Sequence, residues 1–383
     1  MTARVYLDYN ATTPLAPEVV AAMKRVLSEI HGNPSSVHWA GRPARDAVER
    51  ARSQVAALLC CDATEVVFTS GGTEANNAAI KGVFFAKASR GRAFHCVTTT
   101  IEHPAVLEPC GFLEGLGAVV TRVAVDQFGV VDPDDIERAI RPETALISVM
   151  HANNEVGSIQ PLSTISEIAR SREILFHSDA AQSVGKVPVD VEALGVDLLS
   201  VAGHKFYAPK GVGALYIREG VALEPLLHGA GHEAGRRAGT ENILEIVGLG
   251  AACEMAQSWI QDAGGSELRD ALWNGLTAAL GDGVALHGHP TVRLPNTLNV
   301  GFRGINGAEL LAELPYLAAS TGSACHAGVE AISPVLAAMG VERDSALGAV
   351  RFSLGRESKA EELKQIVSDL VRVLQARPSG TNP

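Results

Sequence analysis

Two residues near the middle of the chain have types and positions that suit the binding of a carbonyl cofactor. Lys205 follows an apolar, strand-like segment in SVAGHKFYAPKG, and Asp179 ends another such segment, ILFHSD. A lysine amine forms Schiff bases with carbonyl compounds when a partly dry site lowers its pKa. A carboxylate paired with a pyridine nitrogen keeps the ring protonated and makes it an electron sink. Each residue alone also has an ordinary explanation, since Lys205 suits solvent and Asp179 suits a helix N-cap.

A candidate phosphate site lies in the segment SGGTEANNAAI. Gly71 and Gly72 open the backbone there, and Thr73 and Glu74 begin a predicted helix after the strand-like segment EVVFT. A helix N-terminus presents free N–H groups and positive dipole to an anion. The same pattern also fits a plain capping motif, so it gains weight only beside other evidence.

Further polar side chains follow other strand-like segments. His103 stands in TTTIEHPAV, Asn154 in HANNEVG and Gln182 in DAAQS. An imidazole in that position suits contact with an aromatic cofactor and proton transfer. Ligands of open α/β sheets bind beyond the carboxyl ends of the strands. We therefore expect these side chains to converge with Lys205 and Asp179 at one sheet edge.

Two α/β regions are expected to position these residues. Between about residues 60 and 220, short β-branched segments alternate with helical patterns, which is typical of a parallel sheet. A long helical pattern over 241–262 leads to a second region with the strand-like segments NTLNVGF and AVRFSL and a helix over 308–314. A chain of 383 residues exceeds the usual size of a single core. We predict a larger domain at 14–258 and a smaller one formed by 1–13 and 259–383.

Composition narrows the class of protein. The net charge of −11 and the absence of a basic cluster argue against direct nucleic-acid binding. No Cys/His spacing of the zinc type is present, and no apolar stretch approaches membrane-spanning length. The start, MTARVYLDYN, lacks the pattern of a signal peptide. We therefore expect a cytoplasmic protein without a metal site or a membrane partner.

Five of the six cysteines are expected to be small buried hydrophobes: Cys60, Cys61, Cys96, Cys110 and Cys253. The sixth, Cys325, stands in ASTGSACHAGVEAISPV, a segment rich in Gly, Ser and Ala that suits a flexible loop. A disulfide framework is not expected from this set.

Many of these motifs belong to one family pattern. The chain resembles the cysteine desulfurases, which are fold-type I pyridoxal-phosphate enzymes of the aminotransferase class V group and are related to the selenocysteine lyases. The resemblance runs from about Val5 to Arg356. The stretches that carry it are YLDYNATTP, GNPSSVH, FTSGGTEANN, EHPAV, HANNEVG, DAAQSVGK, GHKFY, HGAGHE, RRAGTEN, LPNTLN, GSACHAG and VRFSLGR. It implies an α/β fold in which a mostly parallel seven-stranded sheet, flanked by helices, adjoins a smaller α/β domain.

The resemblance implies roles for the residues around the ring of pyridoxal 5'-phosphate. Lys205 would be the Schiff-base lysine, Asp179 the partner of the ring nitrogen and His103 the residue stacked on the ring. Asn154 and Gln182 would bind the phenolic oxygen.

The resemblance also implies a phosphate site that two subunits share. Gly72, Thr73 and His204 would hold the phosphate together with Thr240 of a second subunit, which implies a homodimer. Family members often have a serine phosphate ligand where this chain has Ala202, so one hydrogen bond is lost.

For the substrate, the resemblance assigns Arg351 to the carboxylate, with Asn33 alongside it. Arginine presents two parallel N–H donors to a carboxylate. The implied reaction converts L-cysteine to L-alanine. Lys205 moves the α-proton, and Cys325 takes the substrate sulfur as a persulfide for delivery to an acceptor protein. His103 is a better candidate than His326 for activating the Cys325 thiol, because adjacency in sequence does not place His326 adjacent in space.

Three alternatives stay open at this point. A selenocysteine lyase would use the same residues on a selenium substrate. An aminotransferase or epimerase would keep the fold and leave Cys325 incidental. A non-catalytic scaffold that binds sulfur acceptors would not need Lys205 or Asp179 intact. The sequence does not identify the acceptor.

Overall fold

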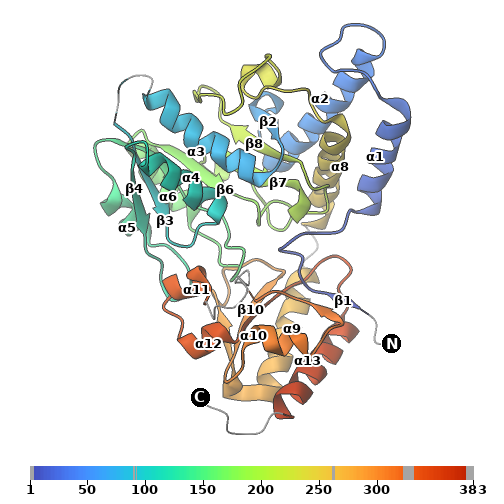
Figure 1. The fold of residues 1–383 in the computed structure, drawn as a ribbon, viewed down its shortest axis with the longest axis vertical. Coiled ribbons are helices and arrows are strands. Elements are labelled where there is room, and N and C mark those ends of the chain that lie inside the picture. Colours follow the sequence, from blue (N-terminus) through green and yellow to red (C-terminus); the bar gives the residue numbers. More distant parts are fainter. Residues whose placement is uncertain (1–3, 89–90, 92, 261–263, 322–331, 377–383) are drawn as a thin grey trace.

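The computed structural model describes residues 4–88, 91, 93–260, 264–321 and 332–376. Figure 1 shows a larger region above, which contains the large sheet, and a smaller region below, built mainly from the C-terminal part of the chain. Strand β1 (Val5–Tyr6), from the other end of the chain, lies with the smaller region because it pairs in parallel with β11 (Leu317–Ala318).

The larger region is built around a seven-stranded sheet with the strand order β2-β8-β7-β6-β5-β3-β4. Its strands are β2 (Val66–Thr69), β3 (His95–Thr99), β4 (Val119–Val123), β5 (Thr144–Ser148), β6 (Leu175–Asp179), β7 (Leu198–Ala202) and β8 (Gly213–Ile217). Neighbours pair in parallel, except that β8 is antiparallel to both β2 and β7. No α-helix lies between β7 and β8, and such a connection joins antiparallel strands. The predicted mostly parallel sheet is confirmed.

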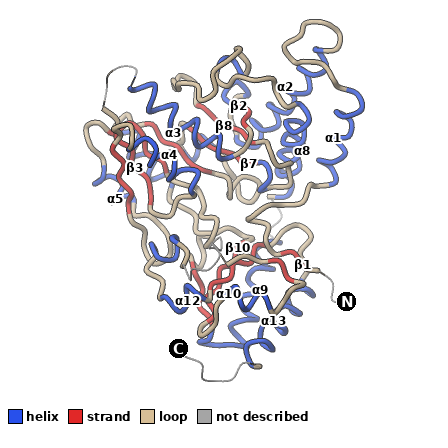
Figure 2. Tube along the Cα trace, in the orientation of Figure 1, coloured by secondary structure: helices blue, strands red, loops and turns tan. Residues whose placement is uncertain are grey.

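Helices cover both faces of this sheet. In β2, Val66 and Phe68 belong to one core cluster and Val67 to another, because successive side chains point to opposite faces. Helices α3 and α4 contribute to the cluster that contains Val67, and α2, α5, α6 and α8 contribute to the other. The helices of this region are α1 (Pro17–Glu29), α2 (Gly41–Leu59), α3 (Gly72–Ala88), α4 (Pro104–Glu114), α5 (Pro133–Ala139), α6 (Leu162–Ser171), α7 (Val191–Leu194) and α8 (Ile243–Trp259). Figure 2 shows these helices around the strands.

Local sequence fixes where two of these helices begin. His103 is the N-cap of α4, and Pro104 occupies its first turn, where a missing backbone N–H is harmless. Gly71 precedes α3 with a φ of 147°, a conformation open to glycine. The two starts place His103 directly beyond β3 and Gly72 directly beyond β2.

The smaller region contains a three-stranded antiparallel sheet with the order β12-β10-β9. Its strands are β9 (Val284–His287), β10 (Thr297–Phe302) and β12 (Ala349–Ser353). Its helices are α9 (Gly264–Leu280), α10 (Gly307–Ala312), α11 (Pro334–Ala338), α12 (Arg343–Leu347) and α13 (Ala360–Gln375). Val5 and Leu7 share a core cluster with residues from Leu272 to Leu370. That shared core joins Val5 and Leu7 to the C-terminal part, and the domain boundaries stay a prediction.

Burial separates the cysteines. Cys96, Cys110 and Cys253 are buried, as predicted, and Cys61 is half-buried. For Cys60 the prediction was wrong, because it is exposed as the left-handed C-cap of α2, with a φ of 57°. Cys325 lies outside the described residues. Within the described ranges, no helix is long and apolar enough to cross a membrane, and no His/Cys/Asp/Glu cluster suits a metal ion.

Candidate active site

A cavity of about 300 Å³ lies beyond the ends of β2, β3, β5, β6 and β7 and reaches Arg351 of the smaller region. Sites for small ligands are commonly cavities of this kind. The sequence-predicted residues that line it are Gly72, Thr73, His103, Asn154, Asp179, Gln182, His204, Lys205 and Arg351. The structure thus brings together residues from five strand ends and one residue of β12.

Lys205 enters the cavity from the short 3-10 turn Gly203–Lys205 that follows β7. Its Nζ donates hydrogen bonds to the backbone oxygens of Asn10, at 2.7 Å, and Ala11, at 2.9 Å. Burial, with the nearby Arg351 guanidinium, lowers the pKa of Lys205 to about 8. Such a lysine has an appreciable neutral fraction near pH 7, which nucleophilic attack on a carbonyl requires.

Asp179 presents a buried carboxylate at the end of β6. One carboxylate oxygen accepts from Asn76 Nδ2 at 2.7 Å, and the other accepts from the backbone N–H of Ala181 at 2.9 Å. Both donors are neutral, so no cation of the protein holds Asp179 in a hydrogen-bonded ion pair among the described residues. The carboxylate therefore suits a protonated pyridine nitrogen as its charged partner.

His103 has a defined tautomer. Its Nδ1 accepts a hydrogen bond of 3.0 Å from the backbone N–H of Ala105, so the neutral ring carries its proton on Nε2. Burial lowers the pKa of His103, which favours that neutral form. The ring lines the cavity as a hydrogen-bond donor that is available to a ligand.

A further group of the lining residues suits a phosphate group. Gly72 and Thr73 form the N-terminus of α3, whose first N–H groups have no partner within the helix. A Cβ on residue 72 would lie 3.1 Å from the Cβ of Ala202, so glycine permits the close approach of α3 and β7. His204 Nδ1 lies 3.1 Å from Thr12 Oγ1, and burial lowers the pKa of this imidazole to about 4.

A network of side-chain amides joins the cavity to the N-terminal segment. Gln182 Nε2 donates to the backbone oxygen of Asn10 at 3.0 Å, and its Oε1 accepts from Lys186 Nζ at 2.7 Å. Lys186 Nζ also donates to Asn10 Oδ1 at 2.8 Å. Burial lowers the pKa of Lys186 well below its ordinary value. Since Lys186 Nζ serves these contacts only as a donor, it fixes which end of each amide faces it.

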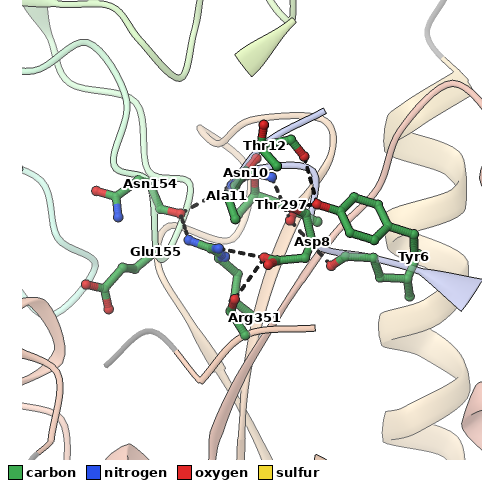
Figure 3. Close-up of polar contacts among 12 residues, drawn as sticks. Tyr6, Asp8, Asn10, Ala11, Thr12, Asn154, Glu155, Thr297 and Arg351 are labelled. Atoms are coloured by element: carbon green, nitrogen blue, oxygen red, sulfur yellow. Dashed lines mark hydrogen bonds and ion pairs between the residues drawn. The ribbon is translucent and has the colours of Figure 1, made fainter. Parts of the chain in front are cut away.

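Arg351 lies on β12 and reaches the cavity across the boundary between the two regions. Figure 3 shows its guanidinium between Asp8 and Asn154. Nη2 contacts Asp8 Oδ1 at 2.8 Å, and Nη1 donates to the backbone oxygen of Asn154 at 2.9 Å. These contacts leave guanidinium donors for a further carboxylate.

Three predicted residues are not part of this cavity as the structure describes it. Asn33 is exposed, and its Oδ1 accepts a hydrogen bond of 2.9 Å from the backbone N–H of Ser35. Thr240 is exposed in the loop before α8. Cys325 lies outside the described residues. The roles assigned to them stay predictions.

Sequence reasoning missed Asp8, Asn10, Asn76 and Lys186. A spacing signal existed for two of them. Lys186 follows Gln182 by four residues, and Asn76 follows Thr73 by three. Asp8 and Asn10 lie in the motif YLDYNATTP, which is nearly 200 residues from Lys205. Only the fold shows that Asn10 lines the cavity and that Asp8 pairs with Arg351.

The sequence is similar over nearly its whole length to known proteins. The family model for aminotransferase class V matches residues 5–366. The chain is 48% identical to the cysteine desulfurase IscS of Dictyoglomus turgidum, over 98% of this chain and 95% of the relative. It is 47% identical to the cysteine desulfurase IscS of Methanosarcina thermophila, over 97% and 92% of the two chains. The chain belongs to the aminotransferase class V family.

Within this class V family, the chain is a cysteine desulfurase, because the relatives at 47 and 48% identity over nearly their full length are cysteine desulfurases. Solved structures agree. A NifS-like protein matches with a TM-score of 0.90 and 39% identity, over 97% of this chain and 99% of the other. A structure titled SspA in complex with cysteine matches with a TM-score of 0.82 and 37% identity, over 91% and 98% of the two chains.

Proposed function

We propose that this cysteine desulfurase binds pyridoxal 5'-phosphate on Lys205, converts L-cysteine to L-alanine and passes the substrate sulfur to Cys325 as a persulfide. The observation that carries this proposal is the placement of Lys205, Asp179 and Arg351 around one cavity. When bound, the cofactor supplies an electron sink for the bonds at the α-carbon of an attached amino acid. The protein supplies everything that orients and protonates that amino acid.

The donor set of the cavity fits the cofactor at both ends. Asp179 matches a protonated ring nitrogen, and the lowered pKa of Lys205 matches attack on an aldehyde. The N-terminus of α3, with Thr73 and His204, matches the phosphate. Ala202 supplies no hydroxyl, so backbone N–H groups carry more of the phosphate binding in this chain than in relatives with serine there.

The protein groups can then be given roles. Lys205 takes the α-proton. Its amine follows β7 and donates to the backbone oxygens of Asn10 and Ala11, and its pKa of about 8 suits proton transfer near neutral pH. Arg351 holds the substrate carboxylate, with Asn33 assigned beside it. His103, with its proton on Nε2, donates a hydrogen bond that stabilises the thiolate form of a cysteine side chain.

Sulfur transfer is the step assigned to Cys325. Its thiolate attacks the sulfur of the substrate, an S–S bond forms, and the C–S bond breaks with its electron pair returning to the carbon skeleton, which gains a proton at Cβ and leaves as alanine. Only a thiolate is sufficiently nucleophilic for this step. The persulfide then passes to an acceptor protein.

Assembly and location are also proposed. Thr240 is exposed, as a residue that completes the phosphate site of a second subunit must be, so we propose a homodimer. A cytoplasmic location stays a prediction from the sequence.

The proposal is tested by the colour and the chemistry of the purified enzyme. Wild-type protein loaded with pyridoxal phosphate should show a visible absorbance band and form alanine from cysteine. Lys205→Ala should lose the reducible covalent link to the cofactor. Lys210→Ala removes an exposed lysine outside the cavity, so it is the matched control and should keep that link. A colourless wild-type protein that cannot be loaded would contradict the proposal and favour a scaffold.

A further inference from the structure

The N-terminal segment places a carboxylate against the smaller sheet. Beyond β1, Asp8 forms a parallel bridge with Ser353 at the end of β12, and Leu7 N donates to the backbone oxygen of Ala318 at 2.8 Å. The hydroxyl of Tyr6 donates to the backbone oxygens of Asp8, at 3.1 Å, and Thr12, at 2.9 Å. These contacts fix the backbone around Asp8, and its side chain meets the arginine of β12 (Figure 3).

The contact between Asp8 and Arg351 is an ion pair largely removed from water. The two side chains are 19% and 7% exposed, and Nη2 lies 2.8 Å from Oδ1. The same Oδ1 accepts a hydrogen bond of 2.9 Å from Ser320 Oγ, which holds it in place. Such charge-assisted bonds are roughly twice as strong as neutral ones. Both bonds of Arg351 have an ionised donor, but only Asp8 also carries the opposite charge, so it restrains the guanidinium more firmly than the backbone oxygen of Asn154 does.

The ion pair does not saturate Arg351. A guanidinium has five N–H donors, and the structure gives Arg351 one bond to Asp8 and one to Asn154. Its Nε has no hydrogen-bond partner among the described residues. Asp8 thus balances the charge with one oxygen while donors stay available for a ligand carboxylate.

A second carboxylate would compete for Arg351 if Asp8 were removed. Glu155 is buried, and the Arg351 guanidinium lowers its pKa against the stronger effect of burial, which raises it to about 7. The hydroxyl of Ser333 donates to Glu155 Oε2 and holds that carboxylate. Without Asp8, the ionised form of Glu155, which is about half of the group near pH 7, would attract the guanidinium away from its present orientation.

We infer that Asp8 is a positioning residue that holds Arg351 in the orientation that receives the substrate carboxylate. The inference rests on the proposed function, which gives that carboxylate to Arg351. Asp8 itself does not touch the substrate. It keeps the buried guanidinium of Arg351 paired and oriented when the substrate is absent, so that this side chain needs little reorganisation when the substrate binds.

The test compares two ligands that differ only in the carboxylate. L-Alanine and ethylamine are titrated into the loaded enzyme, and each dissociation constant is read from the change in visible absorbance. Asp8→Ala should weaken L-alanine about tenfold, the loss expected for one well-placed charged hydrogen bond, and leave ethylamine within twofold. Asp8→Asn keeps an acceptor oxygen without the charge, so its loss should be smaller, about threefold. The KM for cysteine should rise in parallel, with kcat little changed.

Matched variants separate the possible outcomes. Ser320→Ala removes the other bond to Asp8 Oδ1 and keeps the ion pair, so it should weaken L-alanine less than Asp8→Ala does and leave ethylamine binding unchanged. Arg351→Ala should weaken L-alanine alone. If Arg351→Ala has no such effect, the proposed carboxylate site is wrong. If Arg351→Ala has it but Asp8→Ala and Asp8→Asn bind L-alanine normally, or weaken both ligands equally, only the inference about Asp8 is overturned.

Discussion

Removal of Arg351 should make Lys205 a poorer nucleophile toward pyridoxal phosphate. Burial and the Arg351 charge lower the pKa of Lys205 to about 8, whereas Asp179 and Asp8 oppose that shift. At pH 7, roughly a tenth of such a lysine is neutral, against roughly three in ten thousand for a lysine with its ordinary pKa. The structure therefore predicts a neutral fraction about 300-fold above that of an ordinary lysine at this pH, and with it faster loading.

The assay follows the visible band after apoenzyme is mixed with the cofactor between pH 6 and 10. The wild-type rate should rise about tenfold per pH unit below 8 and then level off, because protonation of Lys205 controls it. Arg351→Gln should move the levelling point to higher pH, and Asp179→Asn should move it lower. Titration of the cofactor itself affects all variants alike. A wild-type rate that climbs steadily to pH 10, or shifts of the opposite sign, would refute the reasoning.

Three further predictions concern buried groups outside the substrate contacts. Glu233→Ala should lower the free energy of unfolding by about 3–5 kcal/mol in urea titrations, because it leaves the guanidinium of Arg52 buried without its two-point partner. Burial raises the pKa of Glu102 to about 8 from 4.5, so its contribution to stability falls as pH rises from 4.5 to 8. Glu102→Gln should lack that fall in unfolding measurements at pH 5 and 8, and an identical pH slope would contradict it. Lys186→Met should weaken cofactor binding to the apoenzyme about tenfold, because the amide of Gln182 loses its fixed donor. Unchanged cofactor titrations would show that this amide orients itself.

The sequence predicted the sheet well because buried parallel strands have a strong local signal. Segments such as ILFHSD and DLLSVA became β6 and β7 within one residue at each end. The reversed direction of β8 left no comparable signal, since it follows from a connection without a crossover helix. The predicted burial of Cys60 was wrong for a related reason, because the exposure of this residue depends on where α2 ends.

The cavity was predictable where residues follow strands and unpredictable where distant segments supply partners. Lys205, Asp179 and His103 all end or follow strands, so their convergence follows from the topology of the sheet. The bond from Asp8 to Arg351 spans 343 residues, and no periodicity or spacing reports such a contact. Local sequence therefore identified the groups that do chemistry and missed several that orient them.

In the proposed mechanism, the sulfur of cysteine passes through Cys325. Enzyme loaded with pyridoxal phosphate is mixed with one equivalent of L-cysteine, quenched with an alkylating reagent and digested. The mass of the peptide that contains Cys325 is then measured by mass spectrometry. We predict that this peptide gains the mass of one sulfur atom as one equivalent of alanine appears, and that Cys325→Ala forms neither product at the normal rate. Alanine formation at the wild-type rate by Cys325→Ala, or the extra sulfur on another cysteine, would contradict the account.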